Sequence, residues 1–187
     1  MEFSEFPKIP RLSRDCVITE KIDGTNASIY IPEIPGQIDF PLNVPFLVGS
    51  RTRWITPEQD NAGFARWAYA NEEELLKLGP GHHFGEWWGS GIQRGYGLKE
   101  KRFSLFNTHR WADPETRPKC CGVVPILCEG PFENVTIDMA MHMLRINGSY
   151  ASPGFMRPEG IVIYHKAGNY LFKKTLEKDD AGKGYEK

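Results

Sequence analysis

One lysine stands where nucleotide chemistry would need an amine. Lys21 follows the apolar residues Val17 and Ile18 at the end of a predicted strand, and Asp23-Gly24 then turns the chain sharply. An amine at a strand end can face a nucleotide phosphate. A free lysine is protonated at neutral pH, and burial or nearby positive charge favours loss of the proton before the amine attacks. Taken alone, the residue fits a surface lysine before a turn better than a nucleophile.

Further cations and carboxylates stand at the ends of other predicted strands. Arg51 follows an apolar strand, and arginine forks match phosphate oxygens in bidentate geometry. Glu86 ends another strand, where a carboxylate can face a ribose hydroxyl or a metal ion. Glu159 begins a buried strand, an edge at which carboxylates hold Mg²⁺ well. Each of these side chains, considered alone, also fits an ordinary solvated surface.

Two later strands add an aromatic ring and a pair of lysines. Phe106 lies in an alternating segment and can stack on a nucleobase, although packing in the core is the usual role of a phenylalanine. Lys173 and Lys174 are adjacent in an apolar strand, so alternation sends them to opposite faces. We expect at least one of them to reach a phosphate and the other to be solvated.

Strands dominate the predicted secondary structure, and short turns join several neighbours. This pattern favours an α+β fold of antiparallel β-sheets flanked by helices over a doubly wound parallel fold. An irregular excursion with four prolines is expected at Pro32–Pro45. The predicted strands are Asp15–Lys21, Ala27–Ile31, Phe46–Ser50, His82–Trp87, Phe103–Asn107, Val123–Cys128, Gly160–His165 and Tyr170–Thr175.

Two helices are predicted to flank these strands. The first covers Pro57–Leu78 with Thr56 as its N-cap, and the second covers Thr136–Ile146 and ends at the cap Asn147-Gly148. The apolar face of the first helix would consist of Phe64, Trp67, Ala68, Leu75 and Leu76. The apolar stripe of the second would consist of Met139, Met143, Leu144 and Ile146.

Composition limits the class of protein. The 187 residues fit one domain, and 40% of them are hydrophobic, which is enough for a core. No apolar run is long enough to span a bilayer, and the N-terminal residues lack the features of a signal peptide. We therefore expect a cytoplasmic protein with no membrane partner. The net charge of −1 argues mildly against tight non-specific nucleic-acid binding, so any such contact must come from a local patch.

The cysteines do not indicate a metal site. Cys120 and Cys121 are adjacent, and the spacing to Cys128 does not match paired zinc ligands. Reduced, partly buried thiols are the better interpretation, and Cys16 fits it as well.

The order of the segments along the chain is more specific than any one of them. Lys-x-Asp-Gly at 21–24 precedes Ser-Arg at 50–51, Phe-Gly-Glu at 84–86, an aromatic strand, Glu-Gly-Ile-Val at 159–162 and the lysine strand. This order resembles motifs I, Ia, III, IIIa, IV and V of the covalent lysine nucleotidyltransferases, over roughly residues 19–174. The Glu-Lys-x-x-Gly-Thr-Asn at 20–26 most resembles the ATP-dependent RNA ligase family, especially its nick-sealing class.

The resemblance implies a fold and an activity. Residues 1–187 would form a single nucleotidyltransferase (adenylation) domain of ATP-grasp-like type, with no C-terminal OB or helical domain, because only Leu176–Lys187 follows the lysine strand. With ATP and Mg²⁺ or Mn²⁺, the enzyme would form lysyl-AMP and transfer AMP to a 5′-phosphate. A 3′-hydroxyl would then attack that end to make the phosphodiester.

The resemblance also implies a role for each motif residue. Lys21 would be the nucleophile, and Glu159 and Glu86 would hold metal. The cofactor-binding residues would be Glu20 near adenine, Asn26 and Arg51 at the phosphates or in the sealing steps, Glu86 at the ribose, Phe106 stacked on adenine, and Lys173, Lys174 or both at the α-phosphate. The family's last motif often has a Lys-x-Lys pattern, so the adjacent lysines here leave their equivalence open.

Three alternatives stay open at this point. The same lysine chemistry would serve a DNA ligase or a GTP-using capping-type enzyme, and the fold could also serve as a non-catalytic nucleotide-binding module. The expected partner is RNA, as ends or nicks, with DNA as the alternative. We expect a monomer, and a separate partner protein could supply the substrate binding that a C-terminal domain usually provides.

Overall fold

The computed structural model describes residues 2–33 and 44–177. Most of the predicted excursion at Pro32–Pro45, and residues 178–187 of the C-terminal segment, lie outside the described residues. The chain divides into two compact units, one containing Met1–Lys21 and Pro125–Lys187 and the other containing Ile22–Val124. The chain therefore leaves the first unit directly after Lys21. The assignment of one domain to residues 1–187 stays a prediction.

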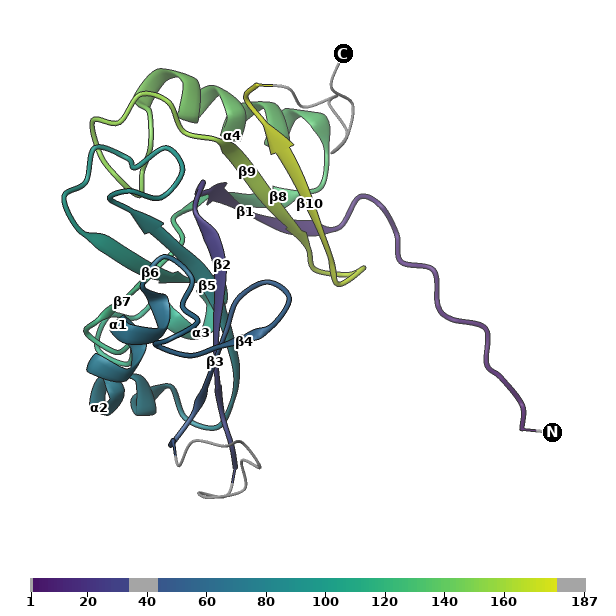
Figure 1. Cartoon of the computed structure of the whole chain (residues 1–187). Helices are drawn as coiled ribbons and strands as arrows, with labels where there is room; N and C mark the ends of the chain where they lie inside the picture. The colour runs from purple at the N-terminus through teal and green to yellow at the C-terminus, as the bar shows by residue number, and fades with distance from the viewer. Residues whose placement is uncertain (1, 34–43, 178–187) are drawn as a thin grey trace, which may run out of the picture. The chain divides into compact units, whose positions relative to one another are not determined.

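The first unit is built on a four-stranded antiparallel sheet with the order β10-β9-β1-β8. The helix α4 (Asn134–Asn147) covers one face of this sheet (Figure 1). Ala140, Met141 and Leu144 of α4 form a core with apolar strand residues such as Ile18 and Ile161. The strands are β1 (Asp15–Lys21), β8 (Ile126–Pro131), β9 (Gly160–His165) and β10 (Tyr170–Thr175).

The apolar stripe predicted for α4 is largely wrong. Leu144 is buried as expected, but Met139 and Ile146 are exposed and the buried positions include Ala140 and Met141. Apolar residues occur on more than one side of this helix, so their positions in the sequence did not define the face that packs on the sheet. The predicted end of the helix is confirmed, because Gly148 has a φ of 74° and its N–H donates to the carbonyl of Leu144.

The second unit is built on a six-stranded sheet with the order β4-β3-β2-β5-β6-β7. All neighbours are antiparallel except β6 and β7, which are parallel. The aromatic residues Phe64, Trp87 and Phe103 lie in its core. The strands are β2 (Thr25–Ile31), β3 (Leu47–Gly49), β4 (Trp54–Ile55), β5 (Gly81–Gly89), β6 (Lys101–Leu105) and β7 (Cys121–Val123).

Short helices complete this unit. They are α1 (Phe64–Ala70), α2 (Glu72–Leu75), a 3₁₀ turn (Leu76–Leu78) and α3 (Thr108–Trp111). The predicted α+β class, with antiparallel sheets flanked by helices, is confirmed. The sequence prediction missed α3 and the two-residue strand β4, which are too short to carry a periodic pattern.

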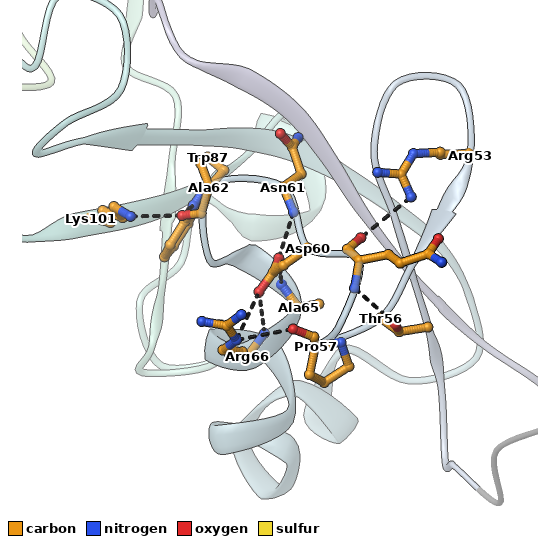
Figure 2. A network of polar contacts seen from close by, with 11 residues as sticks. Arg53, Thr56, Pro57, Asp60, Asn61, Ala62, Ala65, Arg66, Trp87 and Lys101 are labelled. Carbon is orange, nitrogen blue, oxygen red and sulfur yellow. Dashed lines mark hydrogen bonds and ion pairs between the residues drawn. The ribbon is translucent and has the colours of Figure 1, made fainter.

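The helix predicted at Pro57–Leu78 begins too early. Residues 57–63 are not helical, and Thr56 is not the N-cap. The carboxylate of Asp60 accepts the N–H groups of Ala65 and Arg66 at 2.8 and 3.1 Å, as Figure 2 shows, and so satisfies the free donors at the start of α1. A carboxylate at this end also suits the helix dipole.

The strand predicted at Val123–Cys128 is two strands in different sheets. β7 ends at Val123 and β8 begins at Ile126, and the break falls at Pro125, the first residue of the returning segment of the first unit. Proline has no N–H to donate to a ladder, which explains why neither strand continues through it. Because the residues on both sides of Pro125 are apolar, the sequence alone did not show that the chain passes from one sheet to the other here.

Candidate active site

Lys21 and Glu159 meet at one end of the first unit's sheet. The Nζ of Lys21 lies 2.5 Å from Oε2 of Glu159, and their side chains are 23% and 18% exposed. The contact follows from the register, because Lys21 is the last residue of β1 and pairs with Gly160, the residue after Glu159. The amine is thus held by a carboxylate at a position that solvent still reaches.

The register of the first unit distinguishes the two adjacent lysines. Thr19 pairs with Val162, and Val162 pairs with Lys173 on β10. Directly opposed residues of antiparallel strands point to the same face, and residues two apart on one strand also share a face. Lys173 therefore shares a face with Thr19 and Lys21.

Lys174 lies on the other face. It pairs with the fully buried Ile161, which packs in the core beneath α4. Its Nζ reaches the helix, 3.6 Å from Oδ1 of Asp138. The structure thus places Lys173, and not Lys174, on the face of the sheet that carries the candidate nucleophile.

Glu20 is buried and fully engaged within the first unit. Its side chain is on the α4 side of β1 and the residue is 1% exposed. Oε1 accepts the hydroxyl of Ser149 at 2.6 Å, and Oε2 accepts the N–H groups of Tyr150 and Ala151 at 2.8 and 2.9 Å. Burial raises the pKa of Glu20 above its ordinary value, and these hydrogen bonds oppose the rise. The carboxylate ties β1 to the loop after α4, and a contact with adenine stays a prediction.

Glu86 is the centre of the second unit's polar cluster. It is buried on β5, where Oε1 accepts the N–H of Gly24 at 3.1 Å and Oε2 accepts Nδ2 of Asn26 at 3.4 Å. The register aligns Asn26, Glu86 and Ser104 across three strands. These residues lie on the face opposite Trp87 and Phe103, so the aromatic core supports the cluster from behind.

Gly24 is required by a close approach of the backbone. A Cβ at this position would lie 2.5 Å from the carbonyl oxygen of Trp87 and 2.7 Å from the Cβ of Trp88. Both distances are shorter than real Cβ contacts, so the turn after Lys21 can pack against β5 only when the side chain is absent. This close packing explains why the Lys-x-Asp-Gly motif has a glycine at this position.

Asp23 is hydrogen-bonded to the glycine-rich loop that follows β5. Its Oδ2 pairs with Nε of Arg94 at 2.9 Å, and its N–H donates to the hydroxyl of Tyr96 at 2.8 Å. Tyr96 is buried against Trp88 and has a φ of 52°. Arg94 and Tyr96 belong to the glycine-rich segment Ser90–Gly97, and neither of them was predicted from the sequence as part of the site.

Phe106 and Arg51 lie exposed on the second unit. Phe106 follows β6, its N–H donates to the carbonyl of Phe84, and it shares a face with Ser104 and therefore with Glu86. Arg51 lies on the turn between β3 and β4. The second unit thus gathers Asn26, Glu86 and Phe106 on one sheet face, whereas the first unit gathers Lys21, Glu159 and Lys173.

The carboxylates suit one kind of metal site. Among residues 2–33 and 44–177, no three His, Cys, Asp or Glu side chains come together as a metal-binding group. Mg²⁺ commonly uses one or two protein carboxylates and takes its other ligands from water and substrate phosphates. Glu159 and Glu86 can each supply such a carboxylate. All four cysteines are free thiols.

The chain belongs to the RNA ligase family. The family's sequence model matches residues 14–175, which include every predicted motif. No curated protein was similar enough to count as a match. Among the helices of the described ranges, none is both long enough and apolar enough to cross a bilayer.

Solved RNA ligase structures from Naegleria gruberi share the fold. A variant without ligand is 22% identical with a TM-score of 0.56, over 87% of this chain and 50% of that one. A variant with ATP and Mn is 21% identical with a TM-score of 0.58, over 89% and 51%. A variant with AMP and Mn is 20% identical with a TM-score of 0.54, over 88% and 50%. The chain therefore spans about half the length of these ligases.

Proposed function

We propose that the protein is an ATP-dependent RNA ligase that works through a covalent lysyl-AMP. The observation that carries the proposal is the arrangement on the first unit's sheet, where Lys21 is held by Glu159 and shares a face with Lys173. The order of motifs and the family match give this arrangement its interpretation. Two of the ligase structures that share the fold hold ATP and Mn or AMP and Mn, which supports the choice of nucleotide and metal.

In the first step, the lone pair of Lys21 Nζ attacks the α-phosphorus of ATP. A P–N bond forms, the bond to the bridging oxygen breaks, and pyrophosphate leaves. The amine must lose a proton, and Oε2 of Glu159 is within hydrogen-bond distance to accept it. Lys173, on the same sheet face as Lys21, is proposed to contact the α-phosphate oxygens and stabilise the charge that develops on them.

The later steps pass AMP to nucleic acid. A 5′-phosphate oxygen attacks the lysyl-AMP phosphorus, and Lys21 leaves as the amine. A 3′-hydroxyl then attacks the activated 5′-phosphate, which forms the phosphodiester and releases AMP. Asn26 and Arg51 are proposed to serve these sealing steps or to hold phosphates. Both side chains are exposed and therefore accessible to a substrate.

Residues of the second unit are proposed to bind the nucleoside. Phe106 is an exposed ring that can stack on adenine, and the Glu86 carboxylate on the same sheet face can accept ribose hydroxyls. Glu20 is proposed to act near adenine through the loop that its carboxylate holds. Glu159 and Glu86 would provide carboxylates to Mg²⁺ or Mn²⁺. Such an ion neutralises phosphate charge when bound.

Covalent labelling with ATP tests the proposal. Wild-type protein with α-labelled ATP and Mg²⁺ should carry one covalently bound AMP that is stable to alkali and released by acid, as expected of a P–N bond, and Lys21→Ala should carry none. Lys166→Ala is the matched control, because Lys166 is an exposed lysine paired with Glu129 and should label like wild type. Equal labelling of Lys21→Ala, or no labelling of the wild type, would contradict the proposal.

Labelling with GTP, sealing of nicked duplexes and binding of ATP separate the alternatives. Labelling by GTP instead of ATP would indicate a capping-type enzyme. If nicked DNA duplexes are sealed and nicked RNA is not, the protein is a DNA ligase. Binding of ATP without covalent label would indicate a non-catalytic module. A monomeric state, a cytoplasmic role in RNA repair and a partner protein for substrate binding stay predictions.

A further inference from the structure

Four aromatic side chains form a continuous exposed patch on the second unit. Ring centroids are separated by 6.3 Å between Tyr30 and Trp54, 5.9 Å between Tyr30 and His82, and 5.6 Å between Trp54 and His82. The His82 and Phe84 centroids are 4.0 Å apart. Tyr30, Trp54 and Phe84 are 36%, 40% and 54% exposed, and His82 is exposed as well. We call these four residues the aromatic patch.

The sheet order brings the patch together from three strands. Tyr30 pairs with His82 across β2 and β5, and Ser28 pairs with both Phe84 and Gly49, the partner of Trp54. All four rings therefore project from one face of the sheet, the face that also carries Asn26 and Glu86. Across the four paired strands, only the small residues Gly49 and Ser28 lie between Trp54 and Phe84. A Cβ on Gly49 would lie 3.2 Å from the Trp54 ring, which shows that the indole lies against this backbone.

Two arginines lie on the turn next to Trp54, and the carboxylate that shares the face, Glu86, is buried and hydrogen-bonded. Strands β2, β3 and β4, the turn between β3 and β4, and residues 81–85 of β5 contain Arg51 and Arg53 and no Asp or Glu. Both arginines are exposed on the turn that leads into Trp54, and Arg53 also donates to the carbonyl of Gln59 at 3.4 Å (Figure 2). This basic character stands out in a chain with a net charge of −1.

Exposed rings beside cations are the usual features of a surface that binds single-stranded nucleic acid. Flat aromatic faces stack on unpaired bases, and neighbouring cations follow the phosphates. Partial burial lowers the pKa of His82, so its imidazole is a neutral ring at pH 7 and adds a stacking surface instead of a charge. A protein partner would bury the same rings but would not require the two arginines.

We propose that the aromatic patch is a platform on which unpaired bases of the RNA substrate stack, with Arg51 and Arg53 on the adjoining phosphates. The proposal rests on the proposed ligase function for its choice of ligand. It assigns Tyr30, Trp54 and His82, which lie outside the predicted motifs, to the recognition of strands next to the ends that are joined, together with the motif residues Phe84 and Arg51. The patch also supplies the local basic surface that the overall charge does not provide.

A fluorescent 12-nucleotide oligouridylate with a 5′-hydroxyl is the probe. It lacks the 5′-phosphate that a ligase would seal, so its binding does not depend on recognition of that phosphate. Anisotropy at 50 mM salt should show binding by the wild type. Trp54→Ala should weaken it about tenfold, which is the scale for one stacked base. Trp54→Phe keeps a ring and should change binding less than about threefold, because any aromatic face can stack.

Two controls make the result specific. Tyr170→Ala removes another exposed tyrosine, on β10 of the first unit, and should bind like the wild type. Labelling by ATP should be unchanged in Trp54→Ala, because the change leaves the lysyl-AMP chemistry intact. That labelling also shows that the variant is folded.

Three results would overturn the proposal. The first is a wild type that binds no oligouridylate, and the second is that Trp54→Ala and Phe84→Ala both bind like the wild type. The third is complete displacement of the oligonucleotide by saturating ATP, which would assign the rings to the nucleotide pocket. Failure of the wild type to label with ATP, with binding retained, would contradict the ligase proposal and leave the nucleic-acid platform in place.

Discussion

At the scale of single residues, the structure separates two neighbours that the sequence could not distinguish. Lys173 and Lys174 have the same chemistry and adjacent positions, but only Lys173 shares a face with Lys21. Lys174 is directed toward α4 and Asp138. The position of the amine relative to the reacting phosphate, and not its charge alone, decides which lysine can stabilise a transition state.

The first prediction compares these two lysines. Lys173→Ala should slow lysyl-AMP formation about 10²-fold or more, the cost of removing one well-placed charge partner. Lys174→Ala serves as the matched control and should change the rate less than threefold on the scale of an exposed ion pair. Single-turnover labelling with ATP measures both rates. A larger effect at Lys174 would show that the assignment of faces is wrong.

Glu20 gives a second prediction about stability. Glu20→Ala would leave the buried donors of Ser149, Tyr150 and Ala151 without an acceptor, and should lower the free energy of unfolding by about 2–4 kcal/mol. Glu20→Gln keeps an oxygen for the two N–H groups and should lose much less. Urea denaturation at constant pH measures both. Equal losses would indicate that the negative charge, and not the hydrogen bonding, is what matters.

The raised pKa of Glu20 gives a third prediction, about pH. The folded protein binds this proton more tightly than the unfolded chain, so stability should fall as pH rises from about the ordinary value of 4.5 through the raised folded value. Glu20→Gln does not titrate. The stability of the Gln variant relative to wild type should therefore increase across this window and stay constant above it. Urea denaturation at a series of pH values measures the difference, and a constant difference would contradict the prediction.

At the scale of elements, close packing of the turn after Lys21 fixes where the motif can lie. Gly24 sits against the backbone of β5, next to the Glu86 carboxylate that accepts its N–H. The strand β1 ends where its register with β9 brings Lys21 to Gly160. The strand end therefore determines the position of the amine in the first unit, and the glycine allows the turn that follows it to pack in the second unit.

The fourth prediction tests this packing with two glycines. Gly24→Ala should lower stability by about 1–3 kcal/mol because a Cβ has no room, and lysyl-AMP formation should fall with it. Gly130→Ala is the matched control, since its Cβ would make ordinary contacts of 3.8 and 3.9 Å with Thr136. Thermal unfolding and ATP labelling of the two variants provide the comparison. A Gly24→Ala variant as stable as Gly130→Ala would show that the turn relaxes freely.

At the scale of the whole molecule, net charge limits how nucleic acid can bind. A chain with a charge of −1 has little general attraction for phosphates, so binding should depend on the few cations near the aromatic patch. Stacking contributes a part of the affinity that salt does not weaken. This combination distinguishes the protein from strongly basic nucleic-acid binders.

The fifth prediction follows from that charge. The logarithm of the oligouridylate binding constant should fall with log salt with a slope of about −1.4, which corresponds to two phosphates on single-stranded nucleic acid. Arg53→Ala should reduce the slope by about 0.7, whereas Trp54→Phe should leave it unchanged. A titration series between 50 and 200 mM salt, an interval of roughly fourfold, measures both slopes. A much steeper wild-type slope would indicate cations beyond the two arginines.

The sequence by itself indicated the family, because motif residues of fixed type and order are readable without a fold. It also determined the strands β1, β9 and β10, whose predicted limits agree with the structure. The strand β4 was not predictable, because two residues carry no periodic signal. The start of α1 was not predictable either, because it depends on the carboxylate of Asp60, which lies before the helix and outside its periodic pattern.

Only the tertiary structure decided which residues meet. Register assigns Lys173 to the face of Lys21, and sheet order brings Tyr30, Trp54, His82 and Phe84 into one patch from strands that are far apart in the chain. The physical reason is the same in both cases. A side chain's face depends on hydrogen-bonded pairing with strands distant in sequence, and local residue patterns do not encode that pairing.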